Sequence, residues 1–128
     1  PIAPRGKLAD LSPLQGMKLG LLYCSNTSVS DLSPLKGMPL NSLFCDNVLV
    51  TDFSPLAGMN LVKLVCDDTP VSDIEVLENH SSLKDLIIRR TKVTPASVAA
   101  LQKALPNCKI EWDDPAKATT QPATSDTK

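Results

Sequence analysis

Aromatic residues are scarce in this 128-residue chain, which contains only two Phe, one Tyr and one Trp. Any core must therefore be built from aliphatic side chains. The net charge is only -1, from 13 basic and 14 acidic residues, which argues against a surface for nucleic acid or anionic membrane. No apolar run approaches the roughly 20 residues that a membrane-spanning helix requires. The first seven residues contain no hydrophobic signal region. We expect one domain that binds no nucleic acid and does not insert into a membrane.

Motifs for catalysis and cofactor binding are also missing. His80 is the only histidine, and no serine or cysteine stands beside it in a nucleophile motif. The five glycines form no phosphate-binding loop, and the signatures of a protein kinase are absent. We therefore expect a protein that is not an enzyme and uses no cofactor, and we expect His80 to be an exposed loop residue.

A repeat of 21 residues dominates the sequence. Each unit reads D-[LF]-S-P-L-x-G-M-x-L-x-x-L-x-C, and its columns stay in register over three copies. The aspartates at this spacing are Asp10, Asp31, Asp52 and Asp73, and the cysteines are Cys24, Cys45 and Cys66. A fourth copy follows a one-residue insertion near residues 79–82, so the chain holds four repeats of 21 or 22 residues.

The phrase L-x-x-L-x-C within each unit is the leucine-rich repeat pattern. Its second Leu and the Cys lie two residues apart, so they share the inward face of a short strand. One repeat cannot bury that face alone, and successive repeats must therefore stack with parallel strands. The pattern predicts an α/β solenoid, a right-handed coil with short parallel strands on its concave face.

Ser-Pro-Leu predicts a tight turn on the opposite, convex face. Ser33 can cap the turn, Pro34 suits a first helical position, and Gly37 ends the turn after about four residues. So short a segment favours a 3₁₀ or irregular turn. The repeated aspartates stand at the corner before this turn, where a carboxylate can accept backbone N–H bonds. Calcium binding by these aspartates is the less favoured alternative, because their neighbours are apolar.

The pattern changes after the fourth repeat. Residues 96–105 carry apolar side chains at helical spacing, with Thr94 as the expected N-cap. A strand over residues 108–112 then closes the stack, and the charges of Glu111, Asp113 and Asp114 protect its edge. We assign the repeat domain to residues 8–112, a linker or minimal cap to residues 1–7, and a disordered tail to residues 113–128. Since Leu8 starts midway through a unit, we favour the C-terminal part of a longer repeat array over a minimal cap.

The D-L-S-P-L turns, such as Asp31-Leu32-Ser33-Pro34-Leu35, resemble the internalin-type class of bacterial leucine-rich repeats over residues 8–94. The stretch from Val98 to Ile110 is similar to the closing repeat of bacterial repeat proteins, some of which carry a serine/threonine kinase domain upstream. The resemblance implies a curved scaffold that recognises proteins on its concave face. The unit is one residue shorter than the commoner 22, and the Asn ladder that would bond the turn backbone is largely missing.

The cysteine column allows two interpretations. Strands about 4.8 Å apart place Cα atoms within the range of a disulfide, so distance does not forbid a bridge. Free cysteine nevertheless behaves as a small buried hydrophobe, and we favour buried, reduced thiols. Unpaired thiols slightly favour a cytoplasmic location. No C-x-x-C pair supports a zinc site, and we expect no bound metal. Asp67-Asp68 and Asp113-Asp114 are interpreted as solvated corners.

The residues that point outward from the concave face carry the functional prediction. One apolar residue per repeat occupies this row, where polar residues would suit a merely solvated face. Exposed apolar patches and aromatic anchors mark interfaces. We therefore predict a protein-binding module. The alternative is a structural C-terminal segment of a longer array or kinase, in which a covalently linked upstream domain is the partner. The predicted contact residues are Leu21, Tyr23, Phe44, Lys63, Val65, Asp85 and Ile87.

Overall fold

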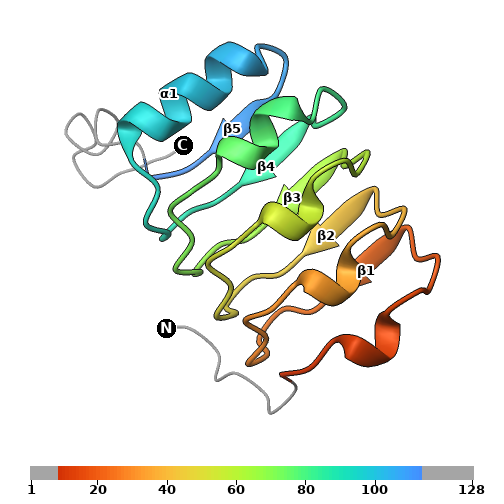
Figure 1. The fold of residues 1–128 in the computed structure, drawn as a ribbon. Coiled ribbons are helices and arrows are strands. Elements are labelled where there is room, and N and C mark those ends of the chain that lie inside the picture. Colours follow the sequence, from red (N-terminus) through yellow and green to blue (C-terminus); the bar gives the residue numbers. More distant parts are fainter. Residues whose placement is uncertain (1–8, 114–128) are drawn as a thin grey trace.

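The computed structural model describes residues 9–113, which form one stack of coils (Figure 1). Each coil contributes one short strand to a five-stranded parallel sheet, in which the strands follow one another in chain order. The predicted leucine-rich repeat solenoid is confirmed. The strands are β1 (Leu21–Tyr23), β2 (Ser42–Phe44), β3 (Lys63–Val65), β4 (Asp85–Ile87) and β5 (Lys109–Glu111).

The convex side consists of 3₁₀ turns, as the Ser-Pro-Leu motifs predict. Proline occupies the first turn of η1, η2 and η3, and glycine follows each turn at a positive φ, as at Gly37 with +79°. The expected cap by Ser33 is wrong. The N-cap residue is Leu32, which makes no side-chain cap bond, and the carboxylate of Asp31 before it accepts the N–H of Ser33 at 2.9 Å. The turns are η1 (Ser12–Leu14), η2 (Ser33–Leu35), η3 (Ser54–Leu56) and η4 (Glu75–Asn79).

The α-helix of the described residues, α1 (Pro95–Ala104), packs beside η4 at the C-terminal end of the stack (Figure 1). Thr94 caps it as predicted, and its hydroxyl accepts the N–H of Ser97 at 3.1 Å. Val98 and Leu101 are buried on the inner side of the helix. The helix and β5 thus close this end of the sheet. No helix within residues 9–113 is long and apolar enough to cross a membrane.

The core is a set of aliphatic columns, each filled by the same repeat position in successive coils. Leu43, Leu64 and Leu86 occupy the strand column and have no exposed surface. The first coil is less complete, because Leu19 and Leu22 in the equivalent columns are only partly buried. Burial of the columns therefore depends on a neighbouring coil on each side.

The predictions for the two ends of the chain lie largely outside the described residues. These are the linker or minimal cap over residues 1–7 and the tail from residue 114 onward. The described part of the repeat domain begins at residue 9 and continues through β5.

The fourth repeat absorbs its extra residue in a longer turn, and His80 lies directly after that turn. The prediction of an exposed His80 is wrong, since only 3% of the residue is exposed. Nε2 lies 2.8 Å from the carbonyl oxygen of Leu56, and Nδ1 lies 3.2 Å from that of Val76. The insertion brings a polar ring to an inward position, where a ring N–H can donate to one of these backbone carbonyls and so compensate for its burial.

The expectation of buried, reduced thiols is wrong for two cysteines of the column and confirmed for Cys24. Cys45 and Cys66 form a disulfide, while Cys24 and Cys108 are free and buried. The in-register pairing of β2 and β3 places the two Cα atoms 4.9 Å apart, within the disulfide range. Burial raises the pKa of the Cys24 thiol to about 11, which suits an inert core residue. The cytoplasmic location was expected because the thiols were expected to be unpaired, and the disulfide removes that reason.

Candidate protein-binding surface

The concave face presents two rows of side chains, from the first and third residues of each strand. The middle residue of each strand points into the core, as with Leu43, which is completely buried. Parallel, in-register pairing places equivalent residues of successive coils side by side. The first row is Leu21, Ser42, Lys63, Asp85 and Lys109, and the second row is Tyr23, Phe44, Val65, Ile87 and Glu111.

Two stacked aromatic rings stand at the start of the second row. The centroids of Tyr23 and Phe44 are 4.5 Å apart, and their planes differ by 9°. The ammonium group of Lys63 lies 5.7 Å from the centroid of Phe44, a cation–π geometry. The rings come from adjacent strands, so the 21-residue period itself creates the stack. Their mutual contact restricts the side chains before any partner arrives.

Exposure along the predicted contact residues is uneven. Tyr23 is 66% exposed and Leu21 is 49% exposed, whereas Phe44 and Ile87 are half-buried. Val65 departs from the prediction of an open apolar row, because only 7% of it is exposed. It stands between Phe44 and Ile87 in the sheet, and larger neighbours on both sides cover a short side chain. The accessible apolar surface is therefore concentrated on the first two coils.

Charged residues replace apolar ones toward the C-terminal coils. Lys63, Asp85 and Lys109 alternate in sign along the first row, and Lys63 and Asp85 are both half-buried. The ammonium of Lys109 lies 3.6 Å from the carboxylate of Glu111, so these two charges form an ion pair within β5. The concave face thus has an apolar, aromatic end and an end with mixed charge.

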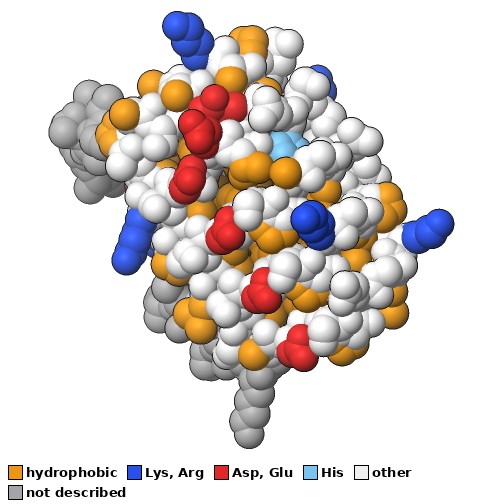
Figure 2. All heavy atoms as spheres, in the orientation of Figure 1, with side chains coloured by type: hydrophobic (Ala, Val, Ile, Leu, Met, Phe, Trp, Pro, Cys, Tyr) orange, Lys and Arg blue, Asp and Glu red, His pale blue; other side chains and the backbone are white. Residues whose placement is uncertain are grey.

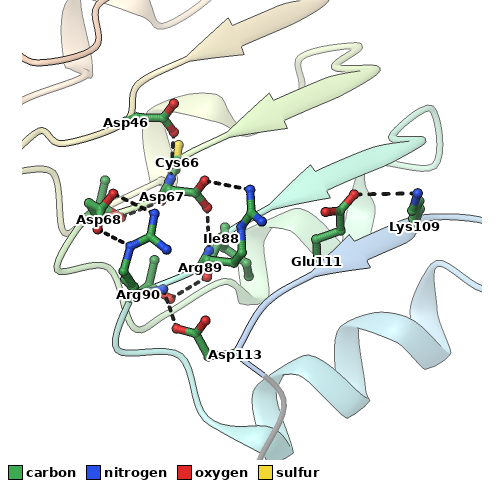
Figure 3. Close-up of polar contacts among 12 residues, drawn as sticks. Asp46, Cys66, Asp67, Asp68, Ile88, Arg89, Arg90, Lys109, Glu111 and Asp113 are labelled. Atoms are coloured by element: carbon green, nitrogen blue, oxygen red, sulfur yellow. Dashed lines mark hydrogen bonds and ion pairs between the residues drawn. The ribbon is translucent and has the colours of Figure 1, made fainter. Parts of the chain in front are cut away.

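A polar network lies at the corners that directly follow the strands (Figure 3). Asp46 accepts the N–H of Asp67 at 2.8 Å, and Asp67 accepts the N–H of Arg89 at 2.6 Å, so the carboxylates link successive coils. Burial raises the pKa of Asp46 despite the backbone bond that it accepts. The prediction of a solvated corner fails for Asp67, which is 7% exposed.

Residues at left-handed φ occupy the next corner position in the coils of β1 to β4. Asn and Asp tolerate this conformation better than most residues do, but Arg90, with a φ of 57°, does not have that advantage. The guanidinium of Arg90 forms an ion pair with Asp68. The backbone N–H of Arg90 donates a hydrogen bond to the carboxylate of Asp113. The ion pair with Arg90 lowers the pKa of Asp68. Asp68 is therefore a paired group and not a merely solvated one.

These corners also show what replaces the missing Asn ladder. The hydroxyls of Thr27, Thr69 and Thr91 donate to the carbonyl oxygen three residues earlier, at 2.8 to 3.0 Å. In addition, the side chain of Asn47 donates to that of Asn26 at 3.0 Å. This set of bonds was not predicted from the sequence. The sequence feature that could have predicted these bonds is the recurrence of Thr at one repeat position.

A line of acidic side chains crosses the coils on the face that Figure 2 shows. Each of the repeated aspartates accepts the N–H of the residue two positions later, as predicted. Hydrogen bonds from Ser33 lower the pKa of Asp31, and those from Ser54 have the same effect on Asp52. Within residues 9–113 no group of three or more His, Cys, Asp or Glu residues is placed to hold a metal ion. The backbone N–H bonds that they accept give the repeated aspartates a structural role in forming the turns.

Comparison with known proteins supports the same class of fold. No family model and no curated protein matches the chain. Among solved structures, internalin C2 from Listeria monocytogenes strain 4b F2365 has a TM-score of 0.76 and 28% identity, over 82% of this chain and 47% of its own. An internalin of the same strain, inlF, has a TM-score of 0.44 and 20% identity, over 94% of this chain and 51% of its own. The likeness to internalin C2 confirms the resemblance to internalin-type leucine-rich repeats. The chain spans about half the length of these internalins.

Proposed function

We propose that the chain is a protein-interaction module that binds its partner on the concave face. The observation that carries the proposal is the exposed aromatic end of that face, where Tyr23 is 66% exposed and stacked on Phe44. Large aromatic side chains bury much area at a low cost in conformational entropy and dominate many interfaces. The stack already holds both rings, which reduces the ordering required on binding.

The proposal includes no catalytic activity. Both ring nitrogens of His80 face backbone carbonyl oxygens, so the histidine is committed to the core. Cys24 and Cys108 are buried, and burial raises the pKa of both thiols, which opposes formation of a nucleophilic thiolate. The groups that most often perform acid–base or nucleophilic chemistry are therefore occupied by structural roles in residues 9–113.

Affinity capture with surface variants tests this function. Four proteins are immobilised: the wild-type chain and the variants Tyr23→Ser, Phe44→Ser and Leu49→Ser. Bound proteins are then recovered from a lysate of the source cells. Leu49 is a matched control, since it is 41% exposed and lies outside the strands. We expect the Tyr23 and Phe44 variants to lose a captured protein that the control retains, with circular dichroism unchanged. Equal capture by all folded variants would count against the proposal.

A further inference from the structure

A free cysteine lies beside the disulfide in the same column of the core. Cys24, Cys45 and Cys66 occupy one repeat position in three successive coils, and the bridge joins the second and the third. We propose that this bridge migrates within the folded chain, by thiol–disulfide exchange with Cys24, from the Cys45–Cys66 pair to the Cys24–Cys45 pair. The inference concerns the core and is independent of the proposed partner binding.

The backbone relates Cys24 to Cys45 in the same way as it relates Cys45 to Cys66. Strand β1 pairs with β2 in the register in which β2 pairs with β3, and each cysteine directly follows its strand. The N–H of Cys24 donates to the carbonyl oxygen of Phe44 at 2.9 Å, and that of Cys45 donates to the carbonyl oxygen of Val65 at 2.8 Å. The bridged Cα atoms are 4.9 Å apart, and neighbouring strands keep a spacing of about 4.8 Å. A Cys24–Cys45 bridge therefore falls within the distance range of a disulfide without a shift of the backbone.

The order of the three sulfurs suits the direction of attack. In thiol–disulfide exchange, the attacking sulfur approaches one sulfur of the bridge from the side opposite to the sulfur that leaves. Equivalent positions of three successive parallel strands lie nearly on one line across the sheet. Cys45 is the middle cysteine of the three, so Cys24 approaches it from the side opposite to Cys66.

The exchange needs no oxidant and no reductant. The Cys24 thiol gives up its proton, and the thiolate forms a new S–S bond with Sγ of Cys45. The bond between Cys45 and Cys66 breaks, and its electron pair leaves with Cys66, which takes up a proton and becomes a thiol. One bridge and one thiol are present before and after the step, so only the position of the cross-link changes.

Burial directs this chemistry to one pair. Cys24 is 3% exposed and the bridged cysteines have no exposed surface, so thiols and reagents in solution have little access to them. On the other side of Cys66, the equivalent position directly after β4 holds Ile88, which has no sulfur. The remaining cysteine, Cys108, directly precedes β5 and therefore lies at the opposite end of the strands. Cys45 is thus the electrophilic sulfur within reach of Cys24.

The protonation of Cys24 sets the rate of the exchange. Burial and the nearby charge of Asp46 raise the pKa of Cys24 to about 11. Because the thiolate is the attacking species, the exchange is slow near neutral pH and accelerates in alkaline solution.

Migration moves the cross-link to the strands that carry the aromatic pair. The Cys45–Cys66 bridge ties the coil of β2 to the coil of β3. The Cys24–Cys45 bridge would tie β1 to β2 directly after Tyr23 and Phe44, whose rings are stacked. The exchange is therefore a device that fixes or releases β1 without a change in the number of cross-links.

Disulfide mapping of the wild-type chain tests the proposal. The Cys45–Cys66 isomer is isolated by reversed-phase chromatography in acid, where thiols do not exchange, and is transferred to neutral or alkaline buffer, with folding checked by circular dichroism. Peptide mapping of acid-quenched samples should show the Cys24–Cys45 bridge, and its formation should become about tenfold faster per pH unit because more of Cys24 is thiolate. In the folded chain no bridge should involve Cys108, whereas a control in urea should form such bridges.

Variants of the column give a matched comparison. After oxidation of the folded chain, a thiol assay in denaturant should find one free thiol in Cys66→Ala, because Cys24 and Cys45 then pair. It should find three in Cys45→Ala, because Cys24 and Cys66 are two strands apart, beyond the disulfide range. A wild-type chain that keeps Cys45–Cys66 as its sole bridge in alkaline buffer, while the urea control exchanges, would overturn the proposal. Three free thiols in Cys66→Ala, with circular dichroism unchanged, would overturn it as well.

Discussion

The bridge between Cys45 and Cys66 gives the most quantitative prediction about stability. It joins positions 21 residues apart and therefore closes a loop of one complete coil. In the chain-entropy model a loop of about that length contributes about 3 kcal/mol to the free energy of unfolding, mainly by restricting the unfolded chain. This is a large share of the 5–15 kcal/mol that is typical of a folded domain. We expect the double variant Cys45→Ala/Cys66→Ala to be destabilised by this amount and by the loss of two buried sulfurs.

Equilibrium unfolding in urea measures the effect, and Cys24 provides the control. Cys24 is in the same column and is 3% exposed, but it is unpaired, so Cys24→Ala measures the loss of one sulfur from the core without a bridge. Subtracting twice the effect of Cys24→Ala from the effect of the double variant should leave about 3 kcal/mol for the bridge. A thiol assay in denaturant should find two free thiols per chain after oxidative refolding, because the chain has four cysteines. Four thiols, or a remainder near zero, would refute the reasoning.

Three further predictions concern the stack and its corners. Leu64→Ala, at a fully buried position, should lower the free energy of unfolding in urea by about 2–5 kcal/mol. Leu22→Ala, at the equivalent but partly exposed position, should lower it distinctly less. Equal losses would contradict the burial gradient. Arg90→Ala should be about 1 kcal/mol less stable than Arg90→Gly, because glycine adopts the left-handed φ of 57° without the steric cost of a Cβ atom. The opposite order would show that the backbone conformation is unimportant there. The pKa of Asp31 is lowered from its ordinary value of 3.8, so its stabilising effect is present above that pH and is lost as the pH falls through the lower folded-state value. The melting temperature from pH 6 to pH 3 should therefore fall less steeply for Asp31→Asn than for the wild-type chain, and identical slopes would exclude this contribution.

The sequence predicts the repeating parts of the molecule well. Columns such as Leu43 and Leu64 recur every 21 residues, and a structure built from equivalent coils must give equivalent positions the same environment. The same logic correctly places Tyr23 and Phe44 side by side, since register pairs them directly. Periodicity alone therefore determines which residues meet on the concave face.

Features that break the repeat are predicted less well. His80 belongs to the insertion in the fourth coil, and no other coil shows that its position points inward. The burial of Val65 depends on the size of its two neighbours and not on its own column. Likewise, a column of thiols at one spacing is compatible with both bonded and free cysteines, and the sequence does not decide which pair forms. These outcomes depend on side-chain packing, which a repeat pattern does not specify.

The central claim is that a partner contacts the strands and not the convex turns. Quantitative acetylation of lysines in the wild-type chain, with and without the captured protein bound, tests this claim. Lys63 lies on the concave face, whereas Lys36 directly follows the turn η2 and Lys103 lies near the end of α1. Binding should protect Lys63 several-fold and leave Lys36 and Lys103 as reactive as in the free chain. Protection of Lys36 or Lys103 with Lys63 unchanged would contradict the account.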